Sequence, residues 1–347
     1  MITLRAQPFA VLIFYLKKAM KLTPLQKGVP WPTQDPFLFC VHHLDHYPAG
    51  NEHMGIDKEL LLGRSIGSDF DPNHEWRMYH GSSVPGFPAH PHCGFETITF
   101  VRQGYIDHSD SLGAAARFGE GDVQWMTAGS GVQHSEMFPL LNKKESNSLE
   151  LFQIWLNLPK KAKSVPPYFQ MLWEHEIPKF NLNGVKIELI YGSLETLKQQ
   201  KCPPDSWAAE TENELCVAHF NMDEATEISI PSSQKSVIKS LYLYEGGIEI
   251  NKQLITEAHQ IILDSSTTYT ICSEQKSKML LLQSKPINEP VAKYGPFVMN
   301  EQNEINQKIN EFRLTFFGGW PWSKNDHTHS SSLERFAKYP DGKTQKP

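Results

Sequence analysis

Hydrophobic and polar residues alternate along much of this chain with a period of two, the spacing of a β-strand with one buried face. Residues 149–158 are interpreted as such a strand, and further strand-like runs cover 37–46, 97–101 and 123–126. Nine of the 22 glycines fall between positions 81 and 131, which is typical of short strands joined by tight turns. The pattern therefore predicts an all-β fold, as an antiparallel barrel or a double-sheet sandwich.

A second β-rich block begins near residue 184 and repeats the first. Residues 237–250 form a predicted strand, turn and strand, like residues 100–107, and residues 258–263 correspond to residues 121–125. The chain thus contains two copies of one β-module. The polar, proline-containing segment 193–215 is expected to be a loop or an insertion in the second copy.

A short helix is predicted near the C-terminus, over residues 301–312, after the proline-rich extended segment 286–300. Three apolar residues recur at helical spacing on one face: Ile305, Ile309 and Phe312.

Two polar segments are expected to be solvated. The lysines between Lys160 and Lys163 follow a predicted strand and suit an exposed turn. The tail after Trp322 is polar, so we expect it to be mobile and its His327 and His329 to be exposed.

Composition and charge narrow the class of protein. The 347 residues include 39% hydrophobic and 21% charged residues, typical of a soluble globular protein of two domains. A net charge of -6 argues against a nucleic-acid binder. The cysteines are odd in number and form no C-x-x-C motif, which favours free thiols in the reducing cytoplasm. They are Cys40, Cys93, Cys202, Cys216 and Cys272.

The first residues contain an apolar run at 9–16, flanked by Arg5 and Lys17. The run is too short to span a bilayer, so no membrane association is predicted from it. A secretory signal is one reading of it, but no small-residue cleavage site follows at once. We favour an upstream start codon, with Met20 opening the functional chain and residues 1–19 outside the fold.

Two pairs of metal-competent side chains stand in the glycine-rich segment, and the members of each pair are two residues apart. The pairs are His90 with His92, and His134 with Glu136. Residues i and i+2 of a strand point to the same face, so each pair reaches one point from one strand. Three imidazoles and a carboxylate suit a divalent first-row metal, since they demand no thiolate. The sequence therefore predicts a metal site where two such strands meet.

Other readings of this segment stay open. Glu96 is in register with His90 and His92 if their strand runs unbroken, so it could bind the metal or hold an imidazole by a hydrogen bond. Gly94 favours a bulge that would spoil this register. The four predicted ligands could also form a polar cluster without metal, but burying such groups unpaired is costly.

The remaining residues of interest near the motif are assigned structural roles. Phe95 and Trp125 are expected in the core, and Cys93 is expected to be a structural thiol. Six upstream histidines have irregular spacing, and each is interpreted as a surface or hydrogen-bonded residue: His42, His43, His46, His53, His74 and His80.

Four segments together resemble the pirin family of bicupins, which belongs to the cupin superfamily. They are H-P-H-C-G-F-E-T-I-T-F at 90–100, G-D-V-Q-W-M-T-A-G-S-G-V-Q-H-S-E-M at 121–137, and looser matches at 156–168 and 285–300. The resemblance covers roughly residues 30 to 315. The chain departs from the pirin pattern at Cys93, where arginine is common, in the 193–215 segment and in its C-terminal extension.

This resemblance implies two tandem cupin (double-stranded β-helix, or jelly-roll) barrels. The implied division is an extension at 1–30, a metal-binding cupin domain at 31–165, a cupin-like domain without metal ligands at 166–315, and a polar tail at 316–347. The pirin pattern places Fe(2+) on His90, His92, His134 and Glu136, although the general affinity order leaves another divalent transition metal open.

Two functions follow from the resemblance. The first is an iron-dependent dioxygenase of quercetinase type, in which a flavonol or similar small aromatic substrate chelates the metal and Glu136 takes the hydroxyl proton. The alternative is a non-enzymatic, redox-responsive regulator that binds a transcription factor or a metabolic enzyme, with no direct nucleic-acid contact. A metal-binding stress protein without turnover is a third reading. A roomy apolar pocket above the metal would favour the enzyme, and an occluded metal beside a flat surface would favour the regulator.

Overall fold

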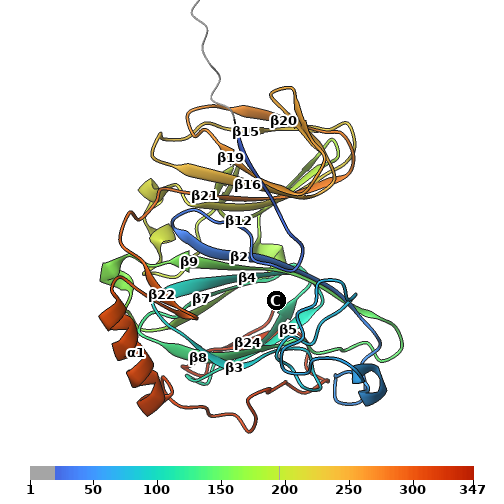
Figure 1. The fold of residues 1–347 in the computed structure, drawn as a ribbon, viewed down its shortest axis with the longest axis vertical. Helices are drawn as coiled ribbons and strands as arrows, with labels where there is room; N and C mark the ends of the chain where they lie inside the picture. The colour runs from blue at the N-terminus through green and yellow to red at the C-terminus, as the bar shows by residue number, and fades with distance from the viewer. Residues whose placement is uncertain (1–19, 195) are drawn as a thin grey trace, which may run out of the picture.

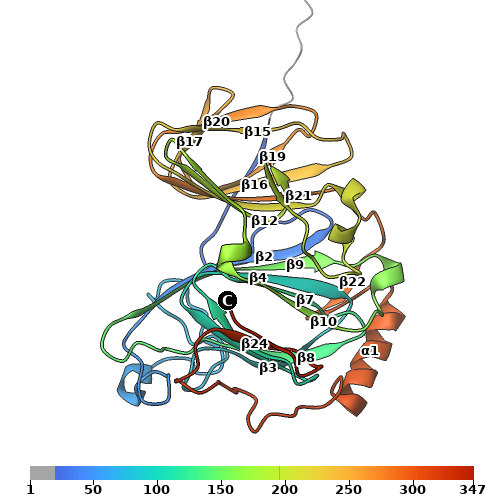
Figure 2. The ribbon, with the colours of Figure 1, turned by 180° about the vertical axis from the view of Figure 1, so that it is seen from behind.

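The computed structural model describes residues 20–194 and 196–347 and contains two β-barrels stacked one on the other, with one α-helix at the side of the first (Figures 1 and 2). The predicted all-β architecture of two tandem barrels with a short C-terminal helix is confirmed. The prediction that residues 1–19 lie outside the fold concerns residues that are not described.

The first barrel consists of two facing sheets. Its upper sheet has the order β10 (Tyr168–Leu172), β7 (Val123–Thr127), β4 (Phe95–Gln103), β9 (Asn147–Asn157) and β2 (Phe37–Tyr47). Its lower sheet has the order β25 (Thr344–Gln345), β24 (Phe336–Lys338), β6 (Ala115–Gly119), β5 (Tyr105–Asp110), β8 (Val132–Met137) and β3 (Gly86–His92).

The second barrel repeats this plan. Its larger sheet contains β1 (Lys21–Pro24), β19 (His259–Leu263), β16 (Ile238–Glu245), β21 (Ser277–Ser284), β14 (Cys216–Met222), β12 (Val185–Leu194), β11 (Lys179–Leu182) and β13 (Leu197–Gln199). Its smaller sheet contains β15 (Glu227–Ile230), β20 (Tyr269–Ser273), β17 (Ile248–Ile250) and β18 (Gln253–Ile255). The order β15-β20-β17-β18 matches β3-β8-β5-β6, which confirms the predicted duplication.

The turn after β4 shows why the two halves share a sequence pattern. Gly104 there has φ +75° and Gly246 has φ +90° in the turn after β16. A side chain at either position would also meet backbone carbonyl oxygens, those of Ser148 and Lys276. Both turns therefore require glycine.

The upper sheet of the first barrel is buried on both faces, so the expectation of one buried face for residues 149–158 is wrong. Leu149 and Leu151 of β9 face the interior of the first barrel. Phe152 and Ile154 point the other way, into a core that also contains Tyr242 and Leu280 of the second barrel. Apolar residues therefore occur on both faces of β9, because the second barrel covers the side that a lone barrel would expose to water.

Strand pairing crosses the domain boundaries drawn from the sequence. β1 lies in the predicted N-terminal extension and pairs with β19 of the second barrel. β10 follows residue 165 but pairs with β7 of the first barrel. Each barrel thus takes an edge strand from beyond a predicted domain boundary, and this strand covers what would otherwise be a sheet edge.

The C-terminal tail is not a mobile appendage, contrary to expectation. β24 pairs with β6 and extends the lower sheet of the first barrel (Figures 1 and 2). Buried Arg117 is bound by Asp107 and donates to the carbonyls of Ser330 and Leu333 in the tail. His329 is buried as well, because the buried carboxylate of Asp107 accepts a hydrogen bond from its backbone N–H. The buried Arg117–Asp107 pair therefore anchors the tail, because the hydrogen-bonding groups that the pair does not use internally bind the tail backbone.

The C-terminal segment also folds back on the first barrel. The hairpin of β22 (Ala292–Tyr294) and β23 (Phe297–Met299) is followed by α1 (Gln302–Thr315), whose Ile305 is buried while Ile309 and Phe312 are partly buried. This confirms the predicted helix and its apolar face. Cys93 packs in the same cluster, and burial raises the pKa of its thiol to about 11, so it is a structural thiol.

Lys163 contradicts the expectation of a fully solvated lysine turn. Its ammonium is buried and donates to Gly94 O and Asn157 Oδ1 at 2.9 and 2.6 Å. Val298 O, in β23, lies 3.5 Å away. Burial lowers its pKa to about 8. Lys163 is inside because the returning segment covers it, whereas Lys160 and Lys161 stay exposed.

The remaining short elements lie in connections. They are the 3₁₀ turns η1 (Lys58–Leu61), η2 (Lys160–Ala162), η3 (Glu174–Glu176), η4 (Trp207–Ala209) and η5 (Thr211–Asn213). Two of these turns and β13 lie in the expected loop 193–215, whose Ala208 and Leu215 pack into the core between the barrels. No helix within the described ranges is long and apolar enough to cross a bilayer.

Charged side chains between the two barrels form one connected network. Arg102 donates to Glu150 at 2.9 Å and to the Tyr244 hydroxyl at 3.3 Å. His219 bridges the Tyr244 hydroxyl, 2.7 Å from its Nε2, and the Glu188 carboxylate, 3.2 Å from its Nδ1. Burial alone would raise the pKa of Glu188, but the hydrogen bond and charge of His219 and the nearby Lys186 lower it to about 2.

Replacing Glu188 with glutamine should weaken this network. The folded pKa lies below the ordinary value of 4.5, so its stabilisation is present above pH 4.5 and is lost as the pH falls toward 2. We expect Glu188→Gln to lower the free energy of unfolding at pH 7 by about 1.5–3 kcal/mol and to flatten its decline below pH 4.5. Chemical denaturation across pH measures both effects. Glu245→Gln, at the exposed pair with Lys278, is the control and should cost less than about 1 kcal/mol; equal losses would contradict the expectation.

Candidate metal centre

The two predicted ligand pairs lie on adjacent antiparallel strands. β3 carries His90 and His92, β8 carries His134 and Glu136, and the β3–β8 register sets His90 directly opposite His134. The two-residue spacing therefore brings the three imidazoles together inside the first barrel, as strand geometry requires. One nitrogen from each ring lies within 4.8 Å of the others.

The orientation of the rings fits a shared metal ion. Nδ1 of His90 lies 2.9 Å from the carbonyl oxygen of Pro88. A carbonyl oxygen only accepts, so Nδ1 carries the proton and donates it. In the neutral ring, Nε2 therefore has a free lone pair. That Nε2 is 3.1 Å from Nε2 of His134. Two nitrogens bound at right angles with bonds near 2.1 Å would be about 3 Å apart. The spacing of this pair is therefore that of neighbouring ligands on one ion.

The environment of the imidazoles also suits a metal site better than a buried polar cluster without metal. His92 and His134 are buried, and burial together with the neighbouring imidazoles holds the pKa of each well below its usual range. Burial lowers the pKa of His90 to about 4. Nε2 of His92 has no hydrogen-bond partner among the described residues. Neutral rings with unused lone pairs, converging in a desolvated site, are what a divalent cation requires.

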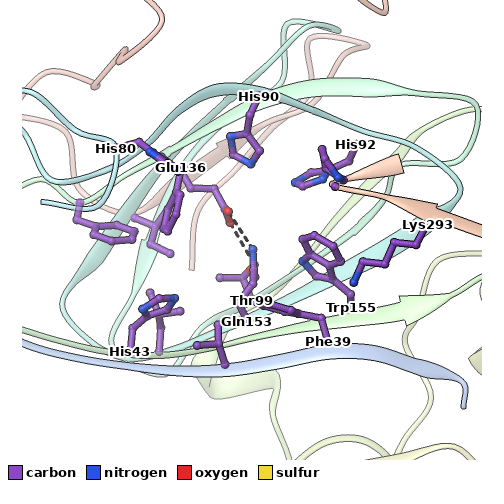
Figure 3. Close-up of a pocket in the computed structure, with 17 residues that line it drawn as sticks. Phe39, His43, His80, His90, His92, Thr99, Glu136, Gln153, Trp155 and Lys293 are labelled. Atoms are coloured by element: carbon purple, nitrogen blue, oxygen red, sulfur yellow. Dashed lines mark hydrogen bonds between the residues drawn. The ribbon is translucent and has the colours of Figure 1, made fainter. Parts of the chain in front are cut away.

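Glu136 stands beside this group and is held in place by two side chains. Its carboxylate accepts a hydrogen bond from Nε2 of Gln153 at 2.9 Å (Figure 3). The hydroxyl of Thr99 lies 3.3 Å from the carboxylate and donates its one proton to Oε1 of Gln153. One of its oxygens lies 3.9 Å from Nε2 of His134. Burial raises the pKa of Glu136 to about 7. The nearby His108 and the polar side chains of Thr99 and Gln153 lower this pKa, but by less than burial raises it. The carboxylate therefore lies beside His134 but outside the group of three imidazoles, which consists of His90, His92 and His134.

Glu96 is not at the site, so neither role considered for it is met. Its carboxylate accepts hydrogen bonds from Thr127 at 2.6 Å and from Ser206, in the second half of the chain, at 2.5 Å. Gly94, with φ +82°, ends the strand that carries the histidines, and Glu96 belongs to β4 in the opposite sheet. Register is lost at this turn, and Glu96 faces the other barrel.

A cavity of about 380 Å³ opens onto the metal centre. This volume is in the range of small-molecule sites. Figure 3 shows His90 and His92 on one side of it and His43 and Phe39 across from them. The ring of Trp155 is in edge contact with that of His92, with centroids 5.4 Å apart. Its walls are mostly apolar and come from both sheets and from the hairpin of β22 and β23. The lining residues are Phe39, Val41, His43, His80, Phe87, His90, His92, Thr99, Ile106, Glu136, Phe138, Leu151, Gln153, Trp155, Lys293, Gly295 and Pro296.

Several of these residues were missed from the sequence. His43 and His80 were set aside with the other upstream histidines, and His80 is indeed exposed and His43 hydrogen-bonded, yet both line the cavity. Gln153 lies two residues after Leu151 on the same face of β9, so the alternation could have placed it inside the barrel. Lys293 could not have been found, since no local pattern shows that its hairpin returns to the first barrel.

Similarity to known proteins agrees with this geometry. The family model described as Pirin matches residues 33–156, and the model of the Pirin C-terminal cupin domain matches residues 217–318. The chain belongs to the pirin family. Human pirin is 31% identical over 270 residues, which are 76% of this chain and 88% of that protein. The resemblance found in the sequence is therefore confirmed, and the two barrels are tandem cupin domains.

Other pirin relatives carry the name of an enzyme. A Vibrio cholerae protein named "Putative quercetin 2,3-dioxygenase" is 35% identical over 235 residues, covering 67% of this chain and 80% of its own. A crystal structure of quercetin 2,3-dioxygenase from Acinetobacter baumannii has a TM-score of 0.66 at 26% identity, and covers 82% of this chain and 86% of its own. Together with the three-histidine group, this pirin kinship indicates a divalent metal site.

Removing one imidazole tests the metal centre directly. We expect His134→Ala to lower divalent-metal affinity at least about 100-fold, since a lost ligand should cost no less than a lost supporting group. Metal should raise the melting temperature of the wild type but not of this variant, because only the folded site binds it. Isothermal titration and thermal unfolding measure the two effects. His46→Ala, an exposed position on β2, is the control; unchanged metal binding in His134→Ala would contradict the site.

Proposed function

We propose that this pirin is an iron(II)-dependent dioxygenase of quercetinase type, acting on a flavonol or a similar small aromatic molecule. The observation that carries the proposal is the open apolar cavity directly beside three converging imidazoles. A protein that used its metal only to change surface shape would not need an aromatic-lined chamber of about 380 Å³ there. The names of the relatives point the same way.

The proposed ligands are His90, His92, His134 and Glu136. When bound, iron(II) would supply Lewis acidity and open positions for a substrate that presents neighbouring hydroxyl and carbonyl oxygens. Imidazole and carboxylate donors are compatible with iron, while the general affinity order also admits copper and zinc.

The chain itself would position the substrate and take its proton. The aromatic walls, with Trp155 and Phe39 in tilted contact at 4.7 Å between ring centroids, would orient a flat substrate and exclude water. The carboxylate of Glu136 is the proposed base for the substrate hydroxyl, and Gln153 and Thr99 would aim it. Gln153 is thus a positioning residue.

The proposed cellular setting is the cytoplasm. All five cysteines are free, and burial raises the pKa of the Cys40 and Cys216 thiols well above the ordinary value. Such thiols suit a reducing compartment, which also favours the ferrous state.

Oxygen uptake with quercetin tests the proposed reaction. We expect iron(II)-loaded wild type to consume oxygen and His134→Ala to consume none. Gln153→Leu should keep its iron but lose roughly 10–100-fold in kcat, as expected for loss of a supporting hydrogen bond. Metal content is measured on the same samples. If wild type contains stoichiometric iron but consumes no more oxygen than His134→Ala, the dioxygenase function is rejected. That result would favour the alternative, a redox-responsive regulator with a protein partner.

A further inference from the structure

A chain of hydrogen bonds runs from a buried ion pair to the wall of the cavity, outside the metal centre. The fully buried Asp45 carboxylate accepts from Nε of Arg77 at 2.8 Å and from the hydroxyl of Tyr79 at 2.8 Å. The same hydroxyl lies 2.7 Å from Nδ1 of His43, which lines the cavity.

The direction of these bonds fixes the tautomer of His43. A tyrosine hydroxyl has one proton, and here it is donated to Asp45. Its oxygen can therefore only accept from His43, so the imidazole carries its proton on Nδ1 and has a lone pair on Nε2. Burial, with the charges of Arg77 and His42, lowers the pKa of His43 to about 3, so the ring is neutral at neutral pH. Nε2 is thus an obligatory acceptor.

The backbone is strained at Tyr79, the residue that fixes the tautomer of His43. Tyr79 has φ 57°, a left-handed conformation that a bulky side chain rarely adopts. It is buried and held there by two backbone hydrogen bonds with Asp69, of 2.9 and 3.1 Å. Strain of this kind persists only where the surrounding structure enforces it, and it clusters at functional sites.

Nε2 of His43 is an acceptor left open to a ligand. It has no partner among the described residues, and the ring lies across the cavity from His90 and His92 (Figure 3). Two other polar groups of the wall are satisfied, since Thr99 donates to Gln153 and Gln153 donates to Glu136. His80, the exposed histidine of the wall, has its Nδ1 2.7 Å from the carbonyl of Gly67, and its Nε2 has no partner among the described residues either. Tyr79 is in edge contact with the His43 ring, with centroids 4.8 Å apart, and keeps it from turning.

We propose that His43 is a specificity-determining residue that accepts a hydrogen bond from a substrate hydroxyl remote from the metal-facing end, and that Asp45 and Tyr79 keep it an acceptor. The substrate class is then a polyhydroxylated aromatic rather than an unsubstituted one. The proposal deepens the proposed function and rests on it for the orientation of the substrate. A site built to bond a hydroxyl discriminates strongly against a ligand that lacks it, since its polar group is then left unpaired.

Anaerobic binding of two flavonols to the iron(II)-loaded full chain tests this role. Quercetin and 3-hydroxyflavone share the metal-facing hydroxyl and carbonyl, but only quercetin has further hydroxyls. Quenching of protein fluorescence gives a Kd for each. We expect wild type to bind quercetin at least about tenfold more tightly, and His43→Phe, which keeps an aromatic ring without the acceptor, to bring the ratio to within about twofold of one.

Three further variants separate recognition from structure. His43→Gln returns an acceptor near the position of Nε2 and should restore part of the ratio. Tyr79→Phe removes only the hydroxyl, so Nδ1 of His43 loses the partner that keeps the proton there. Nε2 is then no longer always an acceptor, and the preference for quercetin over 3-hydroxyflavone should fall at least threefold. His46→Ala, at an exposed position of β2 outside the cavity wall, is the control and should leave the ratio unchanged.

The outcomes decide the proposal independently of catalysis. A ratio in His43→Phe that stays within threefold of wild type overturns the role of His43, even if oxygen uptake is normal. A collapsed ratio with no oxygen uptake by wild type supports the recognition role and rejects the dioxygenase reaction instead.

Discussion

Both faces of the sheet formed by β2, β4, β7, β9 and β10 are covered over most of their length, and the rest of the molecule depends on this constraint. One face contributes Thr99, Gln153 and Trp155 to the cavity. The other contributes Ile98, Phe152 and Ile154 to the core between the barrels. Side chains alternate along a strand, so the residues that shape the cavity and those that join the barrels are interleaved. Each large side chain buried this way contributes about 1.5–3 kcal/mol, which makes the second barrel a structural support of the site.

The second barrel supports the site without copying its chemistry. Its own interior is apolar, built from residues such as Leu241, Ile261 and Leu281. Within the described ranges, His90, His92 and His134 form the group of His, Cys, Asp or Glu side chains close enough to hold a metal. Duplication thus provided one barrel whose interior could carry costly desolvated imidazoles, and another that is optimised for packing. Two polar residues that the second barrel buries, Glu188 and His219, belong to the network that faces the first barrel.

The end of the chain completes the first barrel from outside. Lys293, Gly295 and Pro296 close one side of the cavity, and Lys163 bonds the returning hairpin to the turn at Gly94. The tail then adds β24 to the lower sheet, over the Arg117–Asp107 pair. The cavity wall therefore combines segments more than two hundred residues apart. This arrangement lets residues outside the metal strands, His43 among them, set what the cavity accepts.

The sequence by itself determined the strands, the duplication, the C-terminal helix and the pairing of His90 and His92 with His134 and Glu136. The strands, the helix and the ligand pairs follow from a spacing of two residues or of 3.6 residues along the chain, and the duplication follows from a repeated sequence pattern. Only the tertiary structure decided that Glu96 faces the other barrel, that Lys163 and His329 are buried, and that His43 reaches the cavity. Each of these depends on which distant segment covers a given face. A period of two specifies that a side chain points to one side of a sheet, but it carries no information about what lies on that side.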